Sequence, residues 1–149
     1  MKHLILVLCS LFAFSLSTQA QADPVSWEIT KNKIKSGEYE LIFEATIEPH
    51  WAIYSQFLES EDGPIATSFT FENIENAKLE NKVEEMGQRL DVYDQLFEMN
   101  ISKYKKTVKF VQRVKIEGKS KISGYLTFMC CNDESCLPPK DVPFEFSLK

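Results

Sequence analysis

The stretch Gly124–Pro139, GYLTFMCCNDESCLPP, decides how this chain is interpreted. Up to the cysteines, apolar residues alternate with others at period two, which is typical of a β-strand. The apolar set is Ile122, Gly124, Leu126, Phe128 and Cys130. A second alternating run predicts a strand that returns, with Val142, Phe144, Phe146 and Leu148 on one face. Between the two strands lies CNDESC, a polar turn bracketed by two thiols.

The alternation also separates the two adjacent cysteines. Successive side chains of a strand point to opposite faces, so Cys130 shares the apolar face with Leu126, and Cys131 shares the other face with Thr127. We therefore expect a disulfide between Cys131 and Cys136, with Cys130 packed as a small buried hydrophobe. A bond between the adjacent cysteines Cys130 and Cys131 would be strained.

A close cysteine pair is either a structural staple or a redox centre. Closing a loop of about six residues stabilises a fold by roughly 2 kcal/mol, against about 4.7 kcal/mol for a hundred-residue loop, so a staple would better join distant strands. Nearby features do not lower a thiol pKa: Asp133 and Glu134 lie within the loop, and Leu137–Pro139 is extended rather than a helix start. Such a pair suits exchange with a partner that supplies its own thiolate.

The first 22 residues have the layout of a cleaved secretory signal peptide. Lys2 and His3 precede the apolar run Leu4–Leu16, and the small-residue segment Ala20–Ala22 follows it. The run is too short to span a bilayer and no second apolar run occurs, so we expect no membrane insertion. With the signal peptide, this predicts a periplasmic protein, which we expect to be a monomer. The mature chain, 23–149, suits one domain.

Charge and cysteine count narrow the function classes. The whole chain has 17 Lys+Arg and 22 Asp+Glu, and loss of Lys2 with the leader makes the net charge −6. Nucleic acid is therefore not an expected partner, because phosphate binding needs a basic surface. Three cysteines remain after the leader, which fits one disulfide and one free thiol in an oxidising compartment.

The rest of the chain also has strand patterns. We predict strands at Val25–Lys31, Glu38–Glu48, Ser68–Asn73 and Tyr104–Ile116. His50–Leu58 is expected to be extended, Ile74–Leu90 to form short strands although a helix is also compatible with it, and Asp91–Lys103 to form a long loop. Many short strands without a secure helix predict an all-β, immunoglobulin-like antiparallel β-sandwich.

Other chemistry has few candidate residues. His50 is the one imidazole left in the mature chain to act as a general base, and a Cys–His dyad would need it to meet a cysteine in space. Soft-metal (copper) binding by Cys130, Cys131, Cys136 and His50 is conceivable. However, the two adjacent cysteines point to opposite faces, so neither a metal nor a cofactor is expected.

Four segments resemble the N-terminal periplasmic domain of the thiol:disulfide interchange protein DsbD. They are FMCCNDESCLPP, HWAIYS (50–55), GPIATSFTFEN (63–73) and YDQLFEMNISKYKKTVKFVQ (93–112). The resemblance implies an immunoglobulin-like sandwich with one redox-active disulfide. It maps the family's catalytic cysteines onto Cys131 and Cys136, where Cys136 would form mixed disulfides with partners and Cys131 would resolve them.

The resemblance also implies partners and a shielding residue. The expected electron donor is the thioredoxin-like domain of a membrane reductase, acting in trans because this chain stops at Lys149. The expected acceptors are periplasmic disulfide isomerases or thiol proteins of cytochrome maturation. Phe97 occupies the place of an aromatic residue that caps the disulfide, and Tyr54 is expected to line the same site.

One departure from the family keeps the pairing open. Well-known members have five residues between their cysteines, whereas Cys131 and Cys136 have four between them, and Cys130 would restore five. Two other functions also stay open, namely a β-sandwich binding module with an inert disulfide and a copper-binding protein. The leading hypothesis is an extracytoplasmic thiol:disulfide exchange module that relays electrons through one cysteine pair.

Overall fold

Seven β-strands build the part of the chain that the computed structural model describes, residues 23–60 and 62–149. They are β1 (Val25–Lys35), β2 (Glu38–Ile47), β3 (Ala52–Tyr54), β4 (Ser68–Asp94), β5 (Met99–Phe128), β6 (Cys130–Cys131) and β7 (Lys140–Leu148). The expected signal peptide lies outside the described residues. Within the two described ranges, no helix is long and apolar enough to cross a bilayer.

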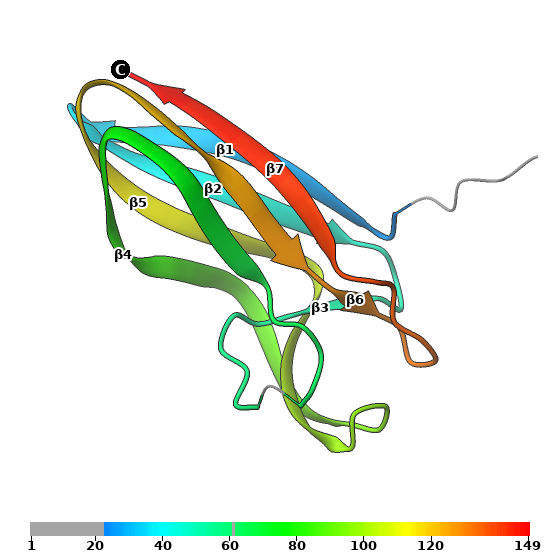
Figure 1. Ribbon diagram of the computed structural model, residues 1–149. Coiled ribbons are helices and arrows are strands. Elements are labelled where there is room, and N and C mark those ends of the chain that lie inside the picture. The colour runs from blue at the N-terminus through cyan, green and yellow to red at the C-terminus, as the bar shows by residue number, and fades with distance from the viewer. Residues whose placement is uncertain (1–22, 61) are drawn as a thin grey trace, which may run out of the picture.

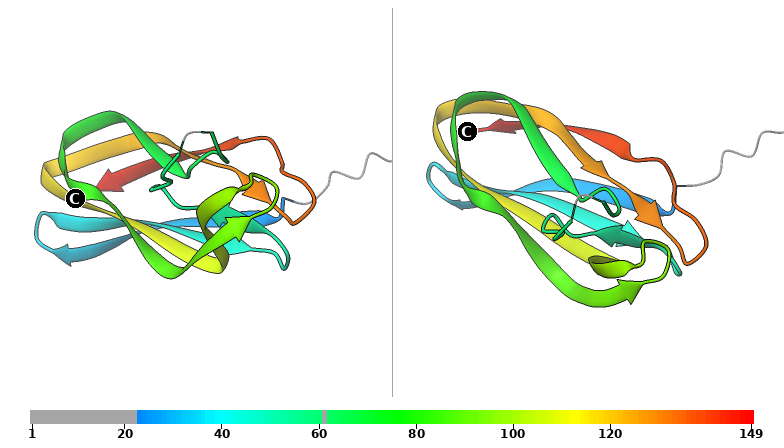
Figure 2. Two further views of the ribbon diagram at one scale, coloured as in Figure 1. Left: turned by 90° about the horizontal axis from the view of Figure 1, so that it is seen from below. Right: turned by 60° about the horizontal axis from the view of Figure 1, so that its bottom comes forward.

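The two longest strands, β4 and β5, run through both layers of a sandwich (Figure 1). Residues 107–115 of β5 pair with β2, which in turn pairs with β1. Residues 120–128 of β5 pair with β7 on the other side. Figure 2 shows the two layers facing each other, joined by the bends of β4 and β5. All these pairings are antiparallel, so the predicted all-β, immunoglobulin-like sandwich is confirmed.

Alternation along β2 places its apolar side chains in the core. Every second residue is buried: Tyr39, Leu41, Phe43, Ala45 and Ile47. The ring of Phe43 packs against Phe69 from β4 and against Phe144 and Phe146 from β7, with centroids 4.9 to 5.8 Å apart. Strands from both layers therefore meet on one aromatic side chain.

The expected long loop at Asp91–Lys103 is wrong. There β4 continues to Asp94 and β5 begins at Met99, with Val92 opposite Ile101 in the hairpin. Only Ile101 among these residues is fully buried, so period two does not show in the sequence. The segment Ile74–Leu90 is strand, as expected, but it is part of one long strand. Shifts of register interrupt the pairing of β4 with β5, and such irregularities blur the period.

The expected extension over His50–Leu58 is only partly correct, because the strand is limited to Ala52–Tyr54. His50 has a positive φ of 71° in the turn that leads into it. The loop 55–67, the β4–β5 turn at 95–98 and the β6–β7 connection lie at the same end of the sandwich (Figure 1). The cysteine pair is at this end, far from the β1–β2 turn.

Candidate functional site: a disulfide under two loops

A disulfide between Cys131 and Cys136 closes the turn after β6, with Cα atoms 4.0 Å apart. Ala52 of β3 pairs with Cys131, and Ile53 pairs with Cys130, so β3 fixes the position of the first cysteine. The backbone N–H of Leu137 donates to the carbonyl of Cys130 at 3.0 Å, which holds the return of the chain. The predicted pairing of Cys131 with Cys136 is therefore confirmed.

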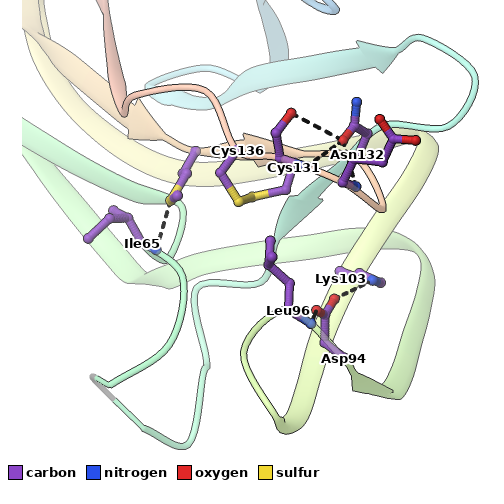
Figure 3. The surroundings of a disulfide bond; sticks show 10 residues. Ile65, Asp94, Leu96, Lys103, Cys131, Asn132 and Cys136 are labelled. Carbon is purple, nitrogen blue, oxygen red and sulfur yellow. Dashed lines mark hydrogen bonds and ion pairs between the residues drawn. A yellow bond between two sulfur atoms is a disulfide. The ribbon is translucent and has the colours of Figure 1, made fainter.

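Asn132 organises the loop between the two cysteines (Figure 3). Its side-chain oxygen accepts hydrogen bonds from the backbone N–H groups of Glu134, at 2.9 Å, and Ser135, at 2.7 Å. The backbone N–H of Asn132 donates to the carbonyl of Ser135 at 2.9 Å. This is the local turn chemistry that asparagine favours, and it brings Cys136 back to Cys131 without help from distant elements.

Cys130 and Cys131 belong to different clusters of buried side chains. Cys130 is free, 2% exposed, and packs in the main core, whereas Cys131 is 4% exposed and packs in a smaller cluster at the end of the sandwich. Burial raises the pKa of the Cys130 thiol to about 11, with the charge of Asp23 adding to the effect and that of Lys140 opposing it. At neutral pH this thiol is protonated, so it is a poor nucleophile.

The smaller cluster surrounds the disulfide with apolar and sulfur-containing side chains. Tyr54 and Ile101 are buried in it with Cys131, and the half-buried members are Leu58, Phe97, Met99, Met129 and Cys136. The Phe97 ring meets Tyr54 edge to face, with centroids 6.2 Å apart. The structure thus brings together all four expected site residues, Cys131, Cys136, Phe97 and Tyr54. Cys136 is the more exposed of the two bonded cysteines.

Tyr54 is a neutral phenol at this site. Burial raises its pKa well above the ordinary range of tyrosine, and the charges of Asp94 and Cys130 act in the same direction. Its carbonyl accepts a hydrogen bond from the buried Thr67 hydroxyl at 2.6 Å. Tyr54 therefore presents a fixed apolar ring to Phe97 and no charge to the disulfide.

An ion pair closes the base of the β4–β5 turn that carries Phe97. Lys103 donates to Asp94 at 2.7 Å, and their side chains are only 13% and 11% exposed. Burial by itself would raise the pKa of Asp94, but the hydrogen bond from Lys103, the N–H groups of Leu96 and Phe97, and the charge of Lys103 together lower it. The turn is thus held by charge as well as by packing.

Lowering the pH is expected to weaken this closure. Because the folded pKa of Asp94 lies below its ordinary value of 3.8, the stabilisation from its carboxylate is complete above that value and is lost as the pH falls through the folded pKa. Asp94→Asn removes the titrating group. The variant should be less stable than the parent near neutral pH and should lose less stability over the acid range.

Urea unfolding at a series of pH values measures this difference. Asp91→Asn is the matched control, because the Asp91 carboxylate is exposed although it pairs with Arg89 and Ser102. A surface pair of that kind contributes little. Identical pH profiles for Asp94→Asn and the parent protein would contradict the assignment.

A second carboxylate fixes the loop after β3. Glu85 of β4 accepts hydrogen bonds from the Ser55 hydroxyl at 2.8 Å, the Gln56 N–H at 2.6 Å and the Tyr104 hydroxyl at 2.7 Å. Burial raises the pKa of Tyr104, and the hydrogen bond to Glu85 adds to the effect. Glu85 therefore ties β4, β5 and the loop 55–67 together beside the site.

The surface beside the disulfide is hollowed. A groove of about 260 Å³ lies between the β4–β5 turn and the cysteine loop, and its lining includes Tyr93, Leu96, Lys103, Asn132 and Asp133. A larger hollow of about 490 Å³ is elsewhere, lined by Lys31, Lys119, Lys121 and residues of β7. Of these two hollows, the smaller one borders the loop between the two cysteines.

Metal ligands do not gather among the residues that the structure describes. No group of three or more His, Cys, Asp or Glu side chains there is arranged to hold an ion. His50 is exposed in its turn, and Cys130 faces the core away from Cys131. The reactive group that the site presents is the Cys131–Cys136 disulfide, of which Cys136 is partly exposed.

The chain is thus a β-sandwich that carries a disulfide turn at one end, packed against aromatic and methionine side chains. The family model "Thiol:disulfide interchange protein DsbD, N-terminal" matches residues 16–147. The chain belongs to this family. Comparison with curated protein sequences finds no match.

One solved structure supports the same fold. The N-terminal periplasmic domain of ScsB from Proteus mirabilis is 19% identical, with a TM-score of 0.59 over 86% of this chain and 48% of that one. This chain thus spans about half the length of that structure. The reduced N-terminal domain of Neisseria meningitidis DsbD is 17% identical, with a TM-score of 0.39 over 80% of this chain and 83% of that one.

Several residues that shape the site have no signal of that role in the sequence. Ile101 and Met99 lie in the segment whose pattern predicts a loop, and the Asp94–Lys103 and Glu85 contacts depend on tertiary structure. Met129 had a usable signal, because period two places it on the same face as Cys131.

Proposed function

We propose that the domain exchanges electrons with thiol proteins through Cys131 and Cys136, in the extracytoplasmic compartment. The observation that carries the proposal is the placement of the disulfide in a surface turn, with Cys131 buried and Cys136 partly exposed. A staple for a sandwich would join distant strands, whereas this bond closes a turn that Asn132 already holds. Membership of the DsbD N-terminal family supports the same function.

The exchange has two balanced halves. A donor thiolate attacks Cys136, forms a mixed disulfide and displaces the Cys131 thiolate. The second thiol of the donor then attacks the donor's sulfur of the mixed disulfide and frees Cys136, so two electrons enter the domain and the donor becomes oxidised. In the outgoing half, the Cys136 thiolate attacks an acceptor disulfide, and Cys131 resolves the mixed disulfide as the acceptor leaves reduced.

The activated thiolate in the first half comes from the donor. The loop between the cysteines carries the exposed acids Asp133 and Glu134, which disfavour a thiolate, and the nearby Lys103 is paired with Asp94. A thioredoxin-like domain of a membrane reductase supplies such a thiolate. The acceptors are disulfide isomerases or cytochrome-maturation thiol proteins of the periplasm.

Stopped-flow mixing tests the proposal. Oxidised protein is mixed with the reduced thioredoxin-like domain of a DsbD-type reductase at two salt concentrations. We expect rapid exchange that slows as salt rises, because the mature chain carries a net charge of −6 and a basic partner surface would assist encounter. A disulfide that resists the reduced domain until the fold is unfolded would instead indicate a binding module with an inert bond.

Removing the Phe97 ring is expected to expose the disulfide. Phe97 is half-buried and packs on the cluster that contains Cys131 and Tyr54. Phe97→Ala should speed reduction by dithiothreitol several-fold, and it should cost less stability than the roughly 3–5 kcal/mol of a fully buried phenylalanine. Reduction kinetics and urea unfolding measure the two effects.

Ile74→Ala is the control for this variant, since Ile74 is 40% exposed on β4 outside this cluster. It should change neither the reduction rate nor the stability by much. Unchanged reactivity of Phe97→Ala, together with a large loss of stability, would make Phe97 an ordinary packing residue.

A further inference from the structure

Exposed apolar side chains gather around the disulfide. Among the described residues, eight large apolar side chains are exposed, and five of them lie on the two loops beside the cysteine turn or at the end of β4. Val92 is the least exposed of the five at 37%, and the other four are Phe57 (51% exposed), Ile65 (47%), Tyr93 (62%) and Leu96 (47%). Figure 3 shows Ile65 and Leu96 on two different loops near the Cys131–Cys136 bond. We call the four residues the apolar rim.

The loop that carries Phe57 and Ile65 is held in place. At its start, the N–H of Ser55 donates to the carbonyl of Ser102 at 3.0 Å, and Glu85 accepts from Ser55 and Gln56. The Ser55 hydroxyl also accepts from the N–H of Phe57 at 3.1 Å. The Phe57 side chain is thus outside the core although its backbone is fixed.

The far half of the loop is fixed by the cluster around the disulfide. The N–H of Ile65 donates to the sulfur of Met129 at 3.4 Å, and Leu58 packs in the same cluster. Gly63 lies against the sulfur of Met99, so closely that a Cβ there would come within 2.8 Å of it. The two ends of the loop, residues 55–58 and 63–65, are therefore fixed against the sandwich, and the second end displays Ile65 to solvent.

Charge on the loops that carry or adjoin the apolar rim is mainly acidic. The described residues of the segments 55–67, 95–98 and 132–135 include five acidic residues and no lysine or arginine, and Lys103 in the adjoining groove is paired with Asp94. Interfaces of proteins combine an apolar centre with a polar periphery, and complementary charge speeds encounter. A fitting partner has apolar side chains beside its reactive thiol and basic residues around them.

We infer that the apolar rim, and Phe57 and Ile65 in particular, is the surface on which a thioredoxin-like dithiol protein docks to reach Cys136. This inference rests on the proposed function. Disulfide exchange brings the partner's sulfur to bonding distance of Cys136, so the surface next to Cys136 is covered during every turnover. The fixed ends of the loop add binding area there without a further ordering cost, because their backbone is already held.

The test compares Phe57→Ala, Ile65→Ala and the double variant with Ile34→Ala. Ile34 is the matched control, because it is also 47% exposed but is the last residue but one of β1. The β1–β2 turn that follows it is at the opposite end of the sandwich from the cysteine turn (Figure 1). The probe is the reduced thioredoxin-like domain of a DsbD-type reductase. Its second-order rate with each oxidised variant is measured by stopped flow, and reduction by dithiothreitol is measured in parallel.

The double variant should react with the protein probe about tenfold more slowly, which corresponds to about 1.4 kcal/mol of lost contact energy. Its reaction with dithiothreitol should be unchanged, and Ile34→Ala should match the parent in both assays. A double variant that matches Ile34→Ala overturns the docking surface and leaves the exchange function intact. A change in both assays overturns it too, because the residues would then act on the disulfide itself. If the parent protein fails to react with the probe while dithiothreitol reduces it, the proposed function fails as well.

Discussion

Cys136→Ala is expected to abolish the capture of partner proteins, whereas Cys131→Ala should retain it. Cys131 is 4% exposed and packs against Tyr54 and Ile101, but Cys136 is partly exposed on the solvent side of the turn. An incoming thiolate can therefore reach Cys136 more easily. Without Cys131, the mixed disulfide on Cys136 cannot be resolved by this domain, so it should accumulate.

The measurement is the fraction of each reduced variant that is trapped as a mixed disulfide by a thioredoxin-like domain whose resolving cysteine has been replaced and whose remaining cysteine carries a thionitrobenzoate group. Attack by the Cys136 thiolate on this activated disulfide forms the mixed disulfide and releases thionitrobenzoate. Cys131→Ala should be trapped nearly completely, and Cys136→Ala only at background level. Cys130→Ala serves as the control, because this thiol is buried in the main core and should leave exchange unaffected. Equal trapping by Cys131→Ala and Cys136→Ala would refute the assignment of roles.

Gly124→Ala is expected to have the largest effect on stability. A Cβ at this position would lie 1.9 Å from the carbonyl oxygen of Thr70 and 3.1 Å from the ring of Phe144. Because the first obstacle is backbone, the clash cannot be relieved by turning a side chain, and the pairing of β4 with β5 would have to shift. We expect a loss of about 3 kcal/mol or more, at the upper end of overpacking effects.

Urea unfolding of Gly118→Ala provides the comparison. Gly118 has a φ of 79°, and a Cβ there would meet nothing within 4 Å. Its replacement should cost only the roughly 1–2 kcal/mol of a left-handed backbone. If Gly124→Ala were no more destabilising than Gly118→Ala, the close approach of the two strands would not be a determinant of the fold.

Local alternation predicts the parts of this fold that have one apolar face. It places Leu41 and Phe43 in the core and separates Cys130 from Cys131, because strand geometry alone determines these faces. The same rule favours the observed pairing of Cys131 with Cys136, whereas the cysteine spacing of the family left Cys130 open as an alternative. Near the tip of the β4–β5 hairpin most side chains are exposed on both faces. Apolar and polar residues therefore do not alternate there, and the pattern predicts a loop where the structure has strands.

The surroundings of the disulfide depend on contacts between distant segments. Glu85 is 30 residues from Ser55 in the sequence, and Ile65 is 64 residues from Met129. No local pattern marks Glu85 as the acceptor for three groups, because an acid on a strand is usually a solvated surface residue. The resemblance to a family identified Phe97 and Tyr54, and spacing alone would not have done so.

The long pairing of β4 with β5 is expected to limit local unfolding around the disulfide. The turn at 95–98 is the tip of the β4–β5 hairpin. Further along the same hairpin, β5 pairs with β2 in one layer and with β7 in the other. Fraying that starts at Phe97 meets first the Asp94–Lys103 pair and then the Glu85 contacts. We therefore expect any opening that uncovers the sulfurs to stay limited to the tip and to leave the hydrophobic core closed.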